Sequence, residues 1–210
     1  MRTKSLPFLS LFKNRKRRSY YLGKEDFYQS RNALNVSSAF SFHQEEYVRD
    51  NPTNREIKFY GVSFGKSEKE IKKLFGTPNF RQKKSLPLDS QITLFYKLNI
   101  KGIKCILQMH LYNDELFFAQ IQLRDANTEL RDIFLSLFKL KYGIESLCWN
   151  ETIQDESGSR IALKDDIVPK ASFFTHDRSI WKKIDAEFHE LAAKNQYTQY
   201  QLEKIALRWS

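Results

Sequence analysis

The clearest pattern along the chain is an alternation of apolar and polar residues between positions 92 and 123. Every second residue of the first run is apolar: Ile92, Leu94, Tyr96 and Leu98. Two further alternating runs, at 103–111 and 117–123, follow short turn sequences. Because side chains on a strand alternate between its two faces, these runs predict a three-stranded antiparallel meander with one covered face.

A short helix is predicted directly before this meander. Ser67 and Glu70 have the spacing of a capping box, in which each side chain satisfies a backbone N–H group of the first turn. An apolar stripe follows at helical spacing: Ile71, Leu74 and Phe75. Gly76 can adopt the left-handed conformation that ends a helix, and Pro78 prevents the helix from continuing.

The same order of elements is predicted a second time. A helix begins at Asn127 or Thr128 and closes near Gly143, and strands fit residues 147–154, 160–164 and 170–175. Asp177 could then cap a C-terminal helical region over 177–207. We therefore expect an α+β fold, with two helix-plus-meander modules at about 57–123 and 127–176 forming adjacent or continuous antiparallel sheets.

The segment from Gly61 to Pro78, with a glycine, a short helix, a leucine and Gly76-Thr77-Pro78, resembles a unit of known small α/β modules. These are the SmpA/OmlA-like outer-membrane assembly lipoproteins and the related modules of the β-lactamase inhibitor protein. The resemblance covers about 57–123 by motif and 127–176 by element order, and it implies a binding or scaffolding unit without catalytic residues. Unlike that lipoprotein family, the sequence shows no secretory signal and no lipid-accepting cysteine near its start.

Charge divides the chain into two parts. The 210 residues contain 35 Lys and Arg against 25 Asp and Glu, a formal charge of +10. Residues 1–31 hold nine cations and two anions, a net of +7, so the other 179 residues carry 26 minus 23, or +3. Residues 1–55 also lack sustained periodicity. We therefore expect a basic, largely irregular N-terminal arm at 1–55 and an α+β domain at 56–210.

The densest cationic cluster supplies a candidate contact for a polyanion: Lys13, Arg15, Lys16, Arg17, Arg18, Tyr20 and Tyr21. Cations neutralise phosphates, and tyrosine rings stack on unpaired bases, so nucleic acid is one interpretation. An anionic membrane surface contacting residues 13–24 is another, because apolar residues precede the cations. An acidic protein partner and a solvated tail without a dedicated ligand are the remaining alternatives.

Trp181 and Trp209 form a candidate partner surface, because tryptophan is enriched where protein interfaces concentrate binding energy. We expect a non-catalytic protein–protein interaction or scaffolding module that binds a protein partner through a helix-free sheet face or the C-terminal helix. No run of about 18 apolar residues suggests a membrane span. We expect a cytoplasmic protein, with an organellar location after transit-peptide removal or a peripheral membrane location as alternatives.

No motif indicates catalysis, a cofactor or a small-molecule ligand. The loop from Gly61 to Ser67 lacks the Walker A spacing, which favours a turn that leads into a capped helix. The four histidines are dispersed, so no metal is expected, and Cys105 and Cys148 are expected to be buried structural thiols. Cys148 and His176 could in principle pair as nucleophile and base, but nothing in the sequence brings them together, so this pairing is disfavoured.

Two acidic pairs could imitate a general acid and base. Asp155-Glu156 and Asp165-Asp166 both fall in predicted hairpin turns, where carboxylates favour local backbone contacts. Solvated turns are therefore the preferred interpretation, and the sequence predicts no enzyme activity.

Overall fold

The computed structural model describes residues 23–31, 49–85, 88–100, 102–124, 126–187 and 190. The chain forms two compact units, 1–32 and 33–210. In the first unit, helix α2 (Lys24–Gln29) begins where the Asp26 carboxylate accepts a hydrogen bond from the Gly23 N–H at 3.1 Å. The predicted polyanion contacts (Lys13, Arg15, Lys16, Arg17, Arg18, Tyr20, Tyr21) and Trp209 lie outside the described residues.

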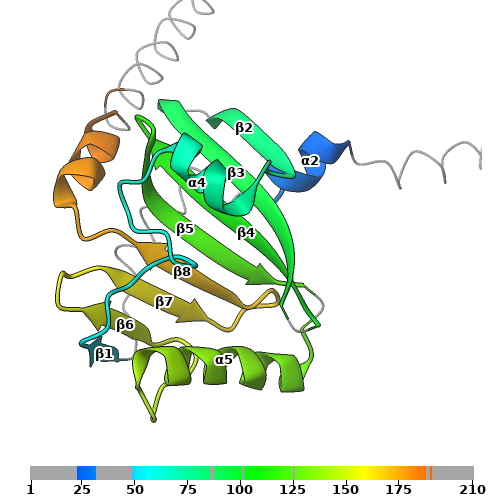
Figure 1. The fold of residues 1–210 in the computed structure, drawn as a ribbon, viewed down its shortest axis with the longest axis vertical. Helices are drawn as coiled ribbons and strands as arrows, with labels where there is room; N and C mark the ends of the chain where they lie inside the picture. Colours follow the sequence, from blue (N-terminus) through cyan, green and yellow to red (C-terminus); the bar gives the residue numbers. More distant parts are fainter. Residues whose placement is uncertain are drawn as a thin grey trace, which may run out of the picture. The chain divides into compact units, whose positions relative to one another are not determined.

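The second unit is built on an eight-stranded mixed sheet with the order β1-β6-β7-β8-β5-β4-β3-β2. Its strands are β1 (Asp50–Thr53), β2 (Phe80–Ser85), β3 (Leu88–Ile100), β4 (Ile103–Tyr112), β5 (Glu115–Leu123), β6 (Thr152–Asp155), β7 (Arg160–Lys164) and β8 (Lys170–Phe174). All neighbours are antiparallel except β1 and β6. With helices α4 (Glu68–Phe75) and α5 (Thr128–Tyr142), this confirms the α+β class (Figure 1).

The strands of both predicted modules belong to this one sheet. Strand β5, the last of the first run, pairs with β8, the last of the second run, from Phe118 opposite Phe174 to Gln122 opposite Lys170. The two antiparallel sheets that we expected to be adjacent or continuous are therefore continuous, while the division into two modules stays a prediction. One seam, β5 against β8, joins the two runs of strands.

Helices α4 and α5 cover the same face of the sheet, where the main core lies. Ile71 from α4 and Phe134 and Phe138 from α5 pack in one cluster with Met109 of β4 and Ile121 of β5. Asn127 caps α5 by accepting a hydrogen bond from the Leu130 N–H at 2.9 Å, and Gly143 ends the helix with a φ of 69°. Both helix boundaries predicted from the sequence are confirmed.

The opposite face is also buried along β4 and β5, so the prediction of one covered face is wrong for these strands. Gln108, His110 and Phe118, which point away from the α4 and α5 side, are fully buried. The Nδ1 atom of His110 lies 3.1 Å from the Thr93 hydroxyl, and burial lowers the pKa of the imidazole to about 3. A helix-free sheet face is therefore not available to a partner along these strands.

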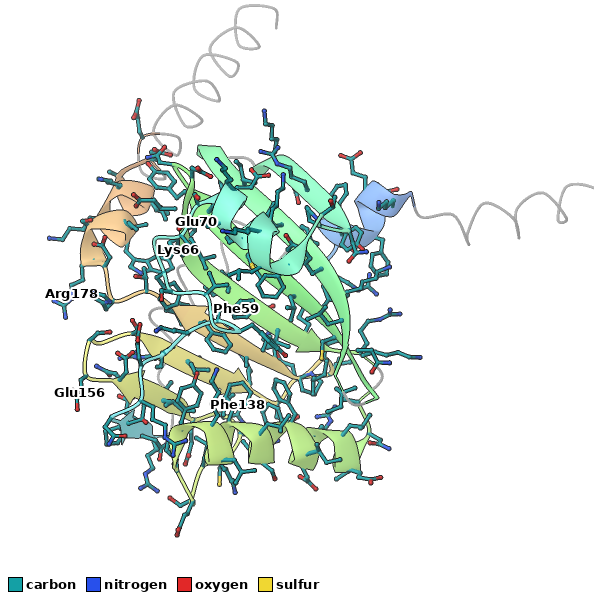
Figure 2. All side chains as sticks on the ribbon, in the orientation of Figure 1. Phe59, Lys66, Glu70, Phe138, Glu156 and Arg178 are labelled. Atoms are coloured by element: carbon teal, nitrogen blue, oxygen red, sulfur yellow. The ribbon has the colours of Figure 1, made fainter. Side chains whose placement is uncertain are left out.

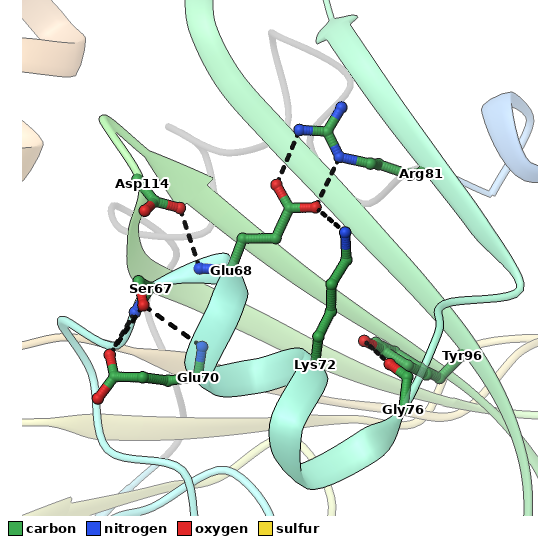
Figure 3. A network of polar contacts seen from close by, with 8 residues as sticks. All are labelled: Ser67, Glu68, Glu70, Lys72, Gly76, Arg81, Tyr96 and Asp114. Carbon is green, nitrogen blue, oxygen red and sulfur yellow. Dashed lines mark hydrogen bonds and ion pairs between the residues drawn. The ribbon is translucent and has the colours of Figure 1, made fainter.

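Helix α4 is held by polar contacts (Figure 3). The capping box is confirmed, since the Ser67 hydroxyl accepts from the Glu70 N–H and the Glu70 carboxylate accepts from the Ser67 N–H at 3.0 Å. The Glu68 carboxylate accepts two hydrogen bonds from Arg81, at 2.7 and 2.8 Å, and lies 2.5 Å from the Lys72 ammonium. These cations lower the pKa of Glu68 to about 2.

Helix α2, two strands and one strand boundary differ from the sequence-based expectation, and α2 and one of the strands lie within residues 1–55. Strand β1 lies in the segment expected to be irregular, and it forms because its backbone pairs with β6, about a hundred residues later in the chain. Strand β2 has a mostly polar sequence and was not predicted. Residues 147–151 form turns instead of the start of a strand, and β6 begins at Thr152.

Candidate functional site

Large apolar side chains are exposed mainly on the part of the second unit formed by the two helices and their neighbouring loops. Among the described residues they are Tyr60, Leu74, Ile133, Leu137, Leu140, Ile167 and Val168. Three of them lie on α5 at helical spacing, and Leu140 is the most exposed of the three, at 75%. The apolar stripe of α5 is thus wider than the sheet beneath it can cover.

A groove of about 280 Å³ opens beside this stripe. The residues that line it are Tyr60, Ile121, Phe134, Leu137, Phe138, Lys141 and Phe173. Ile121 of β5 and Phe173 of β8 come from the sheet, and the Phe134 and Phe138 rings, 5.0 Å apart, come from α5. The cavity therefore has an apolar lining supplied by the sheet and by α5.

Tyr60 enters the groove from a tight turn between Phe59 and Val62. Two hydrogen bonds of 2.9 Å join the backbones of Phe59 and Val62, and the two residues between them have positive φ angles. The fully buried Phe59 ring anchors the turn at 5.0 Å from the Phe173 ring (Figure 2). Tyr60 itself remains 40% exposed, so the turn presents an aromatic ring opposite α5.

Lys141 supplies the one charge in the groove lining. Its ammonium donates to the Lys58 carbonyl at 3.3 Å and lies 5.1 Å from the centre of the Tyr142 ring. Within the described part of the chain it forms no ion pair, and desolvation lowers its pKa. A carboxylate brought to this end of the groove would therefore meet a partly desolvated cation.

Trp181, predicted as a partner surface, is only 8% exposed and belongs to the core of this chain. Its ring packs at 5.3 Å from the Phe117 ring and 6.1 Å from the Phe174 ring, and its Nε1 donates to the Thr175 carbonyl at 3.2 Å. It lies on the inward side of the helical residues 178–187, together with Ile180 and Ile184. This side of the helix therefore has no exposed indole to offer a partner.

Both cysteines were expected to be buried, and the structure confirms this for one of them. Cys105 is buried, as predicted, and burial raises the pKa of its thiol to about 11. Cys148 is exposed, because it lies in the turns before β6 with its thiol near the Ser146 carbonyl. His176 contacts Ser157 and Ser159 instead of Cys148, so the structure does not form this nucleophile and base pair.

The acidic pairs make structural contacts. Asp155 is buried and accepts from the Ile57 and Ser159 N–H groups at 2.8 and 2.9 Å, so it is not a solvated turn residue. Asp165 pairs with Arg131, and Asp166 lies 2.6 Å from the Lys170 ammonium. These carboxylates fix turns and do not converge on a common cleft.

The remaining motifs give no ligand site among the described residues. The Lys66 ammonium pairs with Glu70 at 2.7 Å, so the loop before α4 is occupied by its own side chains. No group of three or more His, Cys, Asp or Glu side chains is placed to hold a metal ion in the part of the chain that is described. No described helix is both long and apolar enough to cross a membrane.

No protein-family model, curated protein or solved structure matches this chain. The arrangement itself defines the class: an α+β protein with a partly uncovered apolar helix beside a groove. The sequence contained one usable signal for the site. Leu135 and Leu140 add apolar positions on either side of the ordinary stripe formed by Leu130, Ile133, Phe134, Leu137 and Phe138. Tyr60 and Lys141 gave no signal, because they meet only through the fold.

Proposed function

We propose that this chain is a non-catalytic protein-interaction module that binds an apolar segment of a partner protein in the groove between Tyr60 and α5. The observation that carries the proposal is the continuity of the groove with the exposed side chains of α5, above all Leu137, which belongs to both. A contiguous exposed apolar surface is typical of interaction sites. A binding or scaffolding role also agrees with the resemblance to SmpA/OmlA-like modules.

The chemistry of the groove suggests what the partner segment carries. Apolar side chains would cover Leu137 and the aromatic rings of the lining, and removal of such surface from water favours association. An acidic residue next to them would pair with Lys141, which forms no ion pair with the described residues. A protein segment fits better than a small ligand, because Ile133 and Leu140 extend the apolar surface beyond the groove lining.

A pair of charge substitutions on α5 tests this proposal. Leu137→Glu places a carboxylate in the groove, whereas Ser136→Glu adds the same charge to an exposed position of the same helix outside the groove lining. Partners captured by the full-length chain would be identified by mass spectrometry and then titrated as purified proteins. We expect a loss of affinity of at least about tenfold for Leu137→Glu.

The Ser136→Glu variant should bind that purified partner as the unchanged chain does. Equal affinities for both variants and the unchanged chain would contradict a partner site at the groove. The circular dichroism spectrum and the melting temperature of each variant show whether the fold is kept.

The alternative function is binding of nucleic acid or an anionic membrane through residues 13–24, favoured by the net +7 of residues 1–31. Deletion of residues 1–31 separates the two proposals. Binding of DNA, RNA or anionic liposomes at low salt should disappear on deletion if the basic segment is responsible. Retention of the protein partner after the deletion would assign that partner to the second unit, and we propose a cytoplasmic location for this interaction.

A further inference from the structure

A second cavity lies between the β6–β7 turn and the helical residues 178–187. It has a volume of about 180 Å³ and is lined by Gln154, Ser157, Gly158, Arg160, Phe174, Thr175, His176, Arg178 and Trp181. Strand register explains part of this set. Arg160 lies opposite Gln154 on β6 and opposite Phe174 on β8, so these three side chains share one face of the sheet.

The charged groups of the lining are cationic. Arg160 and Arg178 are the two arginines of the lining, and neither forms an ion pair with any carboxylate of the described residues. The Gln154 amide oxygen, 3.5 Å from Arg160 Nη2, orients the Arg160 side chain. Two unpaired guanidinium groups at one small cavity leave a positive field that an anion would neutralise.

The nearest acidic side chains lie outside the lining and accept hydrogen bonds, Asp155 also from the lining residue Ser157. Asp155 accepts hydrogen bonds from the Ile57 and Ser159 N–H groups, and Asp177 accepts from the Ser179 N–H at 2.8 Å. Glu156 lies at the tip of the β6–β7 turn, is exposed and is not part of the lining (Figure 2). No described carboxylate therefore belongs to the cavity wall.

Neutral polar groups are held in place beside the two arginines. The Ser157 hydroxyl donates to Asp155 Oδ1 at 2.6 Å, and the Ser159 hydroxyl lies 3.2 Å from His176 Nδ1. These contacts engage Nδ1 of the imidazole, while Nε2 forms no hydrogen bond with the described residues. The Phe174 and Trp181 rings, 6.1 Å apart, supply the apolar part of the cavity wall.

We propose that this cavity binds a phosphate group carried by a small molecule or by a phosphorylated segment. Guanidinium groups recognise phosphate through paired charged hydrogen bonds, and two of them neutralise the charge of a phosphate monoester. The Thr175 hydroxyl, which accepts from the Asp177 N–H, and the His176 imidazole are lining groups that can donate to a tetrahedral anion, which offers more acceptor atoms than a carboxylate. A neutral or cationic ligand would leave both guanidinium charges uncompensated.

Calorimetric and NMR titrations of the full-length chain at constant ionic strength test this inference, with inorganic phosphate, glycerol phosphate, the peptide Gly-phosphoserine-Gly and acetate as probes. Saturable binding of at least one phosphate probe, with no comparable binding of acetate, is the expected result. Tighter binding of the peptide than of glycerol phosphate would identify a phosphorylated segment as the source, and the reverse would identify a small phosphate ester. Absence of saturable phosphate binding, or equal binding of acetate, would overturn the proposal.

Substitutions locate the binding. Arg160→Gln and Arg178→Gln should each weaken phosphate binding at least about tenfold. Lys183→Gln is the matched control, because it removes one charge from the same helical segment at an exposed position outside the lining. Arg178→Lys keeps the charge of an exposed side chain and should retain part of the affinity. An equal loss in the Lys183→Gln variant would show a general charge effect and overturn the site.

Discussion

Helices α4 and α5 cover the same sheet face by different means. In α4, Ile71 is the buried residue, and the helix is fixed by Ser67 at its start and by Glu68 between two cations. In α5, Phe134, Phe138 and Tyr142 are buried, and the remaining apolar stripe stays exposed. Polar contacts thus position a short helix that leaves one large apolar side chain, Leu74, exposed, whereas aromatic packing holds a longer helix that leaves three exposed: Ile133, Leu137 and Leu140.

The largest effect is expected from Phe138→Ala. Phe138 is 6% exposed and packs against the rings of Phe134, Tyr142 and Phe173, so its truncation removes buried area and leaves a cavity. The free energy of unfolding should fall by about 3–5 kcal/mol in urea denaturation. Leu140→Ala, at an exposed position of α5, should change it by less than about 0.5 kcal/mol. Similar losses in both variants would show that α5 does not depend on its aromatic packing.

Glu68→Gln should lower the free energy of unfolding by about 1–2 kcal/mol, because it leaves Arg81 without its bidentate partner. The pKa of Glu68 is lowered from 4.5 to about 2 in the folded chain, so the unfolded chain takes up the proton first on acidification. The difference between Glu68→Gln and the unchanged chain should be complete above pH 4.5 and vanish as pH falls toward 2. Urea denaturation across this pH range measures it.

High salt provides the second check on Glu68. If the ion pairs of Glu68 cause the loss of stability in Glu68→Gln, that loss should be smaller in 1 M NaCl. Salt at this concentration screens charges, because the Debye length falls to about 3 Å. Glu129→Gln, in the exposed first turn of α5, serves as the control and should show a much smaller change with salt.

Replacing the two N-caps compares the helices at equivalent positions. Ser67→Ala and Asn127→Ala should each lower the free energy of unfolding by about 1 kcal/mol, because each removes the acceptor of a first-turn N–H group. Ser67→Gly should lower the free energy of unfolding by only a few tenths of a kcal/mol. Thermal unfolding of the three variants gives the comparison, and a much larger loss for Ser67→Ala would mean that α4 depends on its cap more than α5 does.

The smallest change in stability is expected for Leu137→Gln, within about 0.5 kcal/mol, because its side chain is 40% exposed. The same variant should weaken binding of the protein partner, since Leu137 lines the groove. Leu74→Gln on α4, at 66% exposure, should alter neither property. Melting temperatures and partner titrations separate the two effects, and a binding loss for Leu74→Gln as large as for Leu137→Gln would place the partner elsewhere.

Local signals in the sequence predicted most of the helices and the meander. The capping box at Ser67 and the closing Gly143 depend on neighbours three or four residues away, and both are confirmed. Strand β1 was not predicted, because its one neighbour among the described strands, β6, is distant in the sequence. Strand β2 was missed because its sequence, Phe80–Ser85, does not alternate apolar and polar residues.

The sites were harder to predict than the fold. The groove brings Tyr60, from a loop, to Lys141, at the end of α5, and no spacing rule connects them. The cavity beside the β6–β7 turn likewise combines Arg160 of β7 with Arg178, four residues beyond Phe174, the partner of Arg160 on β8. Trp181 stood out in the sequence as a binding residue, but its ring faces inward, and a single helical stripe does not distinguish core from interface.

Strand β1 has a consequence for the order in which the sheet assembles. The meander β3–β4–β5 closes through short connections, whereas pairing Asp50 with Thr152 closes a loop of about a hundred residues. Loop closure over long distances carries a larger entropic cost and slows the formation of non-local pairs. We therefore expect β1 to join last during folding and to leave first when the native sheet opens locally, while the other strands remain paired.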